Sequence, residues 1–108
     1  MAKTVEITAT ELKKTLGQGT VLMIDIREAR DYAAGHIPGS VSLPLSRLDM
    51  RVASLLSERA RQGGQKLVVV GSDNRQSEQA IALLNSIGVE VDTHYSAGLA
   101  AWQEETGG

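Results

Sequence analysis

Two short runs of branched apolar residues constrain the fold of this chain more than any other feature. Residues 21–26 read VLMIDI and residues 66–70 read KLVVV. A strand with one face in water alternates apolar and polar residues, whereas a strand covered on both faces is apolar almost throughout. We therefore expect both runs to be central strands of a parallel sheet, with Asp25 near the carboxyl end of the first.

Helical patterns separate these strands. Thr8 and Glu11 form a capping box that predicts a helix ending at Gly17 and Gly19, and residues 27–34 predict a short helix closed by Gly35. Ser46 is the expected N-cap of a third helix, whose apolar stripe comprises Leu48, Val52, Leu55 and Leu56. A fourth helix is expected to run from Ser77 to a C-cap at Gly88.

The remaining segments complete an alternating pattern. Residues 4–7 and 89–95 alternate polar and apolar side chains, residues 41–43 form a brief apolar stretch ended by Pro44, and residues 97–105 predict a closing helix around Trp102. Strands that alternate with helices indicate crossover connections. The expected fold is α/β, a small and mostly parallel twisted sheet of about five strands with helices on both faces.

Composition excludes several classes of function. The chain has 108 residues, enough for one domain, and its 11 basic and 13 acidic residues are interspersed. This distribution argues against nucleic acid as a partner, because a phosphate backbone requires a basic stripe. Apolar runs of about five residues are far shorter than the roughly 20 of a membrane helix. Glu6 lies where a secretion signal would be apolar, so we expect a cytoplasmic protein without a membrane partner.

The chain contains no cysteine. This excludes disulfides, thiolate metal ligands and thiol nucleophiles together. The two histidines, His36 and His94, lie far apart, and neither has a second ligand at helical spacing. We therefore expect neither a metal site nor a cofactor.

A polar loop at residues 71–76 is the expected binding site. It follows a central strand and precedes a helix, which is where ligands gather in parallel sheets. Backbone N–H groups and the helix dipole can form a cradle for an anion there. Asp73 would repel an anion in this cradle, whereas Arg75 would attract one. The loop consists of Gly71, Ser72, Asp73, Asn74, Arg75 and Gln76.

Three segments, in this order, resemble the rhodanese superfamily. Asp25-Ile26-Arg27-Glu28 followed by YAAGHIPGS at residues 32–40 is similar to the family's first signature. Residues 68–70 and the loop that follows match the layout of its active-loop region, and GLAAW at residues 98–102 resembles its closing motif. The resemblance implies a single rhodanese-like domain over residues 1–108. Its structural signature would include Asp25, Arg27, His36 and Trp102.

The resemblance also implies which residue is missing. In rhodaneses the active loop begins with a cysteine, which carries sulfur as a persulfide from a donor such as thiosulfate to a thiol or cyanide. This chain has Gly71 at that position or, if the loop is aligned through Asn74 and Arg75, Val70. Ser72 is the nearest hydroxyl, but a serine cannot form a persulfide and needs a base, for which His36 or His94 would have to approach.

The signature residues also have structural interpretations, which we favour. Asp25 and Arg27 are expected to bond each other and the backbone, holding the loop after the strand. His36 lies in a turn, where a histidine more often serves as a hydrogen-bonding strut than as a proton shuttle. Trp102 is expected in the core.

Two hypotheses follow. The first is a catalytically inactive rhodanese-like domain that acts as a binding or regulatory module, linked to sulfur metabolism, with a protein partner or a small anion at the loop. The alternative is a thiosulfate or persulfide sulfurtransferase whose cysteine is replaced in this version of the chain, or a loop that performs another reaction such as phosphate-ester hydrolysis. A third hypothesis places the active rhodanese domain on another subunit of a larger assembly.

Overall fold

A five-stranded parallel sheet forms the centre of the molecule. The computed structural model describes residues 3–107, and its strands follow the order β1-β5-β4-β2-β3. Every pair of neighbouring strands is parallel, which confirms the α/β fold expected from the sequence. The strands are β1 Val5–Glu6, β2 Val21–Asp25, β3 Val41–Ser42, β4 Lys66–Val70 and β5 Thr93–Tyr95.

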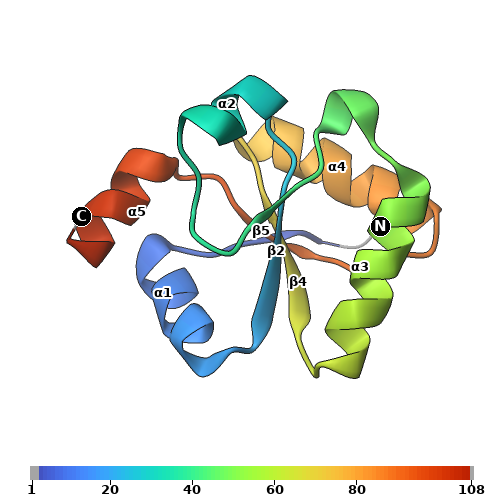
Figure 1. Cartoon of the computed structure of the whole chain (residues 1–108), viewed down its shortest axis with the longest axis horizontal. Helices are drawn as coiled ribbons and strands as arrows, with labels where there is room; N and C mark the ends of the chain where they lie inside the picture. Colours follow the sequence, from blue (N-terminus) through green and yellow to red (C-terminus); the bar gives the residue numbers. More distant parts are fainter. Residues whose placement is uncertain (1–2, 108) are drawn as a thin grey trace.

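Helices cover both faces of the sheet (Figure 1). Helices α1 and α5 lie on one side and α3 and α4 on the other, while α2 lies near the ends of the strands. No helix within residues 3–107 is long and apolar enough to cross a membrane. The helices are α1 Ala9–Gln18, α2 Ala29–Ala34, α3 Met50–Gln62, α4 Asn74–Ser86 and α5 Leu99–Thr106, and a 3-10 turn occupies Leu45–Arg47.

The sheet divides the apolar core in two. On β4, Leu67 and Val69 join the cluster beneath α3 and α4, whereas Val68 and Val70 join the cluster beneath α1 and α5. Both sets are buried, which explains why this strand is a continuous apolar run. The layered core fixes the position of the loop that leaves the carboxyl end of β4.

The helix ends confirm some expectations and correct others. Thr8 and Glu11 form the predicted capping box, but α1 continues through Gly17 and ends at Gly19, whose φ of 69° is left-handed. Ser46 was the wrong N-cap for α3. The Asp49 carboxylate caps that helix by accepting from two backbone N–H groups, while Ser46 lies in the 3-10 turn.

Two further expectations were wrong in detail. Leu55 is 64% exposed, because α3 turns Ala53, Leu56 and Ala60 toward the sheet and leaves Leu55 on the other side. The last strand was expected over residues 89–95, but only Thr93–Tyr95 pair with β4. Residues 89–92 approach the sheet without joining it.

Candidate functional site

The loop after β4 is shorter than its sequence indicates. Helix α4 begins at Asn74 with Asp73 as its N-cap, not at Ser77 as predicted. Asn74, Arg75 and Gln76 therefore form the first turn of α4, and only Gly71, Ser72 and Asp73 link strand to helix. The polar run that suggested a six-residue loop is largely a helix start, where polar side chains satisfy unpaired N–H groups.

The loop uses its own backbone amides. The Ser72 N–H donates to the Gln76 side-chain carbonyl at 2.7 Å, and the Gln76 N–H donates to the Asp73 carboxylate at 2.8 Å. The Gly71 N–H donates to the carbonyl of Tyr95 at 3.1 Å. An anion that used the amides of Gly71, Ser72 or Gln76 would have to displace these internal partners, one of which is itself a carboxylate.

Gly71 has no room for a side chain in this conformation. A Cβ atom at Gly71 would overlap the Ser77 hydroxyl oxygen and lie 3.3 Å from the Ser77 Cβ and backbone nitrogen. Ser77 is fully buried. The atom of another residue thus occupies the space where the side chain of a cysteine would begin.

Ser77 belongs to a chain of hydrogen bonds that sequence reasoning missed. Its hydroxyl lies 2.7 Å from the Ser96 hydroxyl, which lies 2.8 Å from Nδ1 of the buried His94. One signal was available, because Ser77 is a polar residue on the helical face that carries Ala80, Ile81 and Leu84. The chain locks the first turn of α4 against β5.

The two histidines do not serve Ser72 as bases. His94 is hydrogen-bonded to Ser96. Nδ1 of His36 lies 2.9 Å from the carbonyl of Tyr32, and its imidazole stacks on the Tyr32 ring with 3.8 Å between the ring centroids. Within residues 3–107 neither ring hydrogen-bonds Ser72. The same part of the chain contains no group of three or more acidic or histidine side chains that could hold a metal ion.

Asp25 and Arg27 brace the loop after β2. The Arg27 guanidinium donates to both carboxylate oxygens of the fully buried Asp25 and, at 2.7 Å, to the carbonyl of Gly35. Hydrogen bonding to Asp25 raises the pKa of Arg27 above its ordinary value. The positive charge of Arg27, which could otherwise attract an anion, is therefore already paired with Asp25.

A pocket of about 450 Å³ opens beside Gly71, between α2 and α5. Its walls include the side chains of Ile37, Val70 and Leu99, and its ionic groups are Arg27 and Asp31. Tyr95 also lines it and donates its hydroxyl to the carbonyl of Gly98 at 2.7 Å, and burial raises its pKa. The pocket retains the place expected for a ligand and presents a mainly apolar wall.

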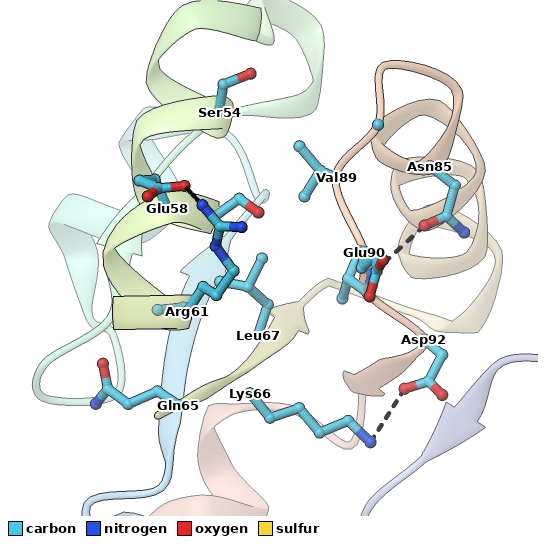
Figure 2. A pocket seen from close by; sticks show the side chains of 14 residues that line it. Ser54, Glu58, Arg61, Gln65, Lys66, Leu67, Asn85, Val89, Glu90 and Asp92 are labelled. Atoms are coloured by element: carbon cyan, nitrogen blue, oxygen red, sulfur yellow. Dashed lines mark hydrogen bonds and ion pairs between the residues drawn. The ribbon is translucent and has the colours of Figure 1, made fainter. Parts of the chain in front are cut away.

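Trp102 lies outside this pocket. It is 8% exposed and packs in the cluster beneath α1 and α5. A larger groove, of about 910 Å³, lies at the opposite end of the sheet, where β4 begins (Figure 2). This groove, larger than the pocket beside Gly71, is thus remote from the loop.

Comparisons with known proteins agree with this geometry. The family model described as rhodanese-like domain matches residues 8–105. An uncharacterized protein of Synechocystis is 32% identical over 96% of this chain, which spans 57% of that relative's length. Human thiosulfate:glutathione sulfurtransferase is 26% identical, over 97% of this chain and 98% of its own.

A solved structure shows the same relationship. The rhodanese-like domain of an Anabaena protein has a TM-score of 0.71 and 31% identity, covering 96% of this chain and 75% of that one. The matching region includes β4, the loop with Gly71 and α4. The chain belongs to the rhodanese-like domain family, whose other members include sulfurtransferases, and it lacks the active-loop cysteine.

Proposed function

We propose that this rhodanese-like domain has lost sulfur transfer and acts as a binding or regulatory module through residues 71–76 and the pocket beside them. One observation carries the proposal. Gly71 stands where the family resemblance expects a cysteine, and the Ser77 hydroxyl fills the space its side chain would need. Sulfur transfer by a persulfide needs a thiolate, which this sequence cannot supply.

The pocket favours an apolar side chain of a protein partner over a small anion. Ile37, Val70 and Leu99 provide apolar walls. The guanidinium of Arg27 is already paired with Asp25, and the carboxylate of Asp31 adds negative charge to the rim. An apolar group in such a pocket gains free energy by leaving water, while an anion would exchange hydration for little.

A link to sulfur metabolism is supported by the relatives. Human thiosulfate:glutathione sulfurtransferase and a thiosulfate sulfurtransferase of Pseudoalteromonas translucida both match most of this chain. A domain with their scaffold and no thiol could bind the proteins that sulfurtransferases bind without accepting sulfur. The proposed role of the module is therefore beside a sulfur-transfer reaction, not within it.

The catalytic half of the proposal is tested by a thiosulfate and cyanide assay. We expect thiocyanate production to equal that of a protein-free control, while human thiosulfate:glutathione sulfurtransferase serves as the positive control. Turnover above the protein-free rate refutes the loss of sulfur transfer.

The binding half is tested by two comparisons. Sulfate, thiosulfate, phosphate and arsenate should change the melting temperature no more than chloride at equal ionic strength. An anion present at ten times its Kd would raise it by at least about 6 °C. In crosslinking from a native extract, a partner at this pocket should be lost with Leu99→Asp and retained with Leu83→Arg, an exposed change on α4. Selective stabilisation by one anion would favour the anion instead.

The alternative, a sulfurtransferase with a replaced cysteine, is tested by Gly71→Cys. We expect at most weak activity, because the new side chain must displace the Ser77 hydroxyl and the loop holds Asp73 where a persulfide benefits from positive charge. Robust turnover by this variant would support the alternative.

A further inference from the structure

The pocket beside Gly71 has an apolar wall that is already in place. The side chains of Ile37 and Val70 are buried, and both belong to the cluster beneath α1 and α5. Leu99 packs against the same cluster. A Cβ atom at Gly35 would lie 2.8 Å from the Cδ2 atom of Leu99, so the end of α2 and this leucine are in close contact. The apolar wall is therefore held by packing and does not have to form when a ligand binds.

The ionic groups at this pocket leave a net negative charge. Arg27 and Asp31 line the pocket, and the buried carboxylate of Asp25 pairs with the Arg27 guanidinium. At neutral pH the two carboxylates and the one guanidinium leave a net charge of −1. The Asp31 carboxylate is exposed and makes no ion pair within residues 3–107. A positively charged group on a ligand would compensate it.

The charge of Asp31 acts on the other ionic group of the pocket. The pKa of Arg27 is raised first by the hydrogen bond to Asp25, and the charges of Asp25 and then of Asp31 add to this effect against that of burial. Turning the guanidinium toward Asp31 would break its hydrogen bonds to the Asp25 carboxylate and the Gly35 carbonyl, at 2.8 and 2.7 Å. The cation that pairs with Asp31 therefore has to come from a partner.

The volume of the pocket leaves room for an apolar and a basic side chain together. At about 450 Å³ it falls within the range of pockets that hold drug-sized molecules, which are larger than one amino-acid side chain. In an extended segment, residues i and i+2 lie on the same side of the chain. An apolar residue and a basic residue at this spacing can therefore enter the pocket from one segment.

We propose that the pocket binds a short extended segment of a partner protein, in which an apolar side chain contacts Val70 and Leu99 and a lysine or arginine two residues away pairs with Asp31. This inference rests on the proposed function and adds to it the charge of the partner. Burial of the apolar side chain supplies affinity, and the charge opposite Asp31 supplies selectivity against acidic segments.

A titration followed by amide NMR tests the binding. The probe is the peptide acetyl-Gly-Leu-Gly-Lys-Gly-amide, and its controls replace Lys by Nε-acetyl-lysine, Lys by Glu, or Leu by Ala. The Lys peptide should shift the amides of Gly71 and Gly98, which line the pocket. Its affinity should fall by about two- to fivefold with acetyl-lysine, which keeps the stem and loses the charge, and further with Glu. Replacing Leu by Ala should weaken binding by about tenfold.

A variant of Asp31 tests the selectivity. Asp31→Asn removes the charge and keeps the size of an exposed side chain, so the protein should fold normally and bind the Lys and acetyl-lysine peptides equally. The matched control is Glu104→Gln, which removes an exposed carboxylate of α5 outside the pocket and should keep the wild-type preference. In the wild type the preference should shrink near 1 M salt, where the Debye length is about 3 Å. A preference that survives Asp31→Asn overturns the proposal.

Failure of this inference differs from failure of the proposed function. If replacing Leu by Ala weakens binding while the Lys, acetyl-lysine and Glu peptides bind equally, the pocket takes an apolar side chain and the inferred charge of the partner is wrong. Tighter binding of the Glu peptide overturns the inference as well. If no peptide shifts the amides of the pocket, the inference fails, and crosslinking with Leu99→Asp still decides whether a partner binds there.

Discussion

The two ends of the sheet use their polar groups in opposite ways. At the carboxyl end, the amides of Gly71 and Ser72, the guanidinium of Arg27 and the hydroxyl of Ser77 are bonded within the molecule. At the amino end, a groove about twice as large is lined by Glu90, whose exposed carboxylate makes no ion pair within the described residues. A domain can thus keep the scaffold of a reactive site while internal hydrogen bonds occupy these polar groups. Polar groups at the other end of the sheet stay exposed.

Mutations at the carboxyl end of the sheet should reduce stability more than mutations at the amino end, and Arg27→Ala should have the largest effect. It leaves the buried carboxylate of Asp25 without its charged partner, which typically costs about 3–5 kcal/mol. Urea denaturation measures this loss, and the exposed Arg30→Ala should change stability by no more than about 0.5 kcal/mol. A loss below about 1 kcal/mol for Arg27→Ala would mean that the ion pair of Asp25 and Arg27 does not stabilise the carboxyl end of the sheet.

Gly71→Cys should come next, with a loss of about 2–3 kcal/mol from overpacking against Ser77. Ser77→Ala alone should cost about 1 kcal/mol, because it removes one buried hydrogen bond. Combining the two should cost less than the sum, since the alanine removes the overlapping oxygen. The control is Gly63→Cys, where the nearest atoms would lie at 3.4 Å. Additive losses would show that Ser77 does not fill the space beside Gly71.

At the amino end of the sheet, Asn85→Ala should lower the free energy of unfolding by only about 1 kcal/mol. Asn85 is exposed, and its amide makes ordinary neutral hydrogen bonds. It should nevertheless speed the amide hydrogen exchange of residues 89–91, because the segment is no longer held against α4. Chemical denaturation and amide hydrogen exchange measure the two effects. Gln79→Ala, also exposed on α4, should change neither. Unchanged exchange of residues 89–91 in Asn85→Ala would show that Asn85 does not hold this segment.

The smallest effect on stability should come from the ion pair of Lys66 and Asp92 at the amino end of the sheet. Hydrogen bonds from the Thr93 hydroxyl and then from Lys66 lower the pKa of Asp92. A lowered carboxyl pKa stabilises the fold above its ordinary value of about 4, and this contribution is lost as the pH falls through the folded-state pKa. Lys66→Ala should therefore cost at most about 0.5 kcal/mol at pH 7, because both side chains are largely exposed, and less still in acid. A cost that grows as the pH falls would contradict this assignment.

The sequence predicted the fold well where one physical effect dominates. Strand β4 was placed over its exact residues, because an apolar run covered on both faces has few other solutions. The capping box of Thr8 and Glu11 was equally decisive, since both bonds are local. The parallel sheet followed from the alternation of such segments.

Prediction was weaker where tertiary contacts decide. The start of α4 was placed three residues late, because Asp73 and Gln76 act as caps in the structure and look like loop residues in the sequence. The strand expected from residue 89 does not pair there, because Asn85 and Leu84 take its backbone groups. The contact of Ser77 with Gly71 could not be predicted, since it depends on how closely α4 approaches β4.

The most direct test of the loss of sulfur transfer is the intact mass of the unmodified protein after incubation with thiosulfate. A chain without a thiol has no atom that can hold the transferred sulfur, so the mass should remain that of the untreated protein, and added cyanide should release no thiocyanate beyond the background. A stable gain of one sulfur atom, released as thiocyanate by cyanide, would contradict this conclusion.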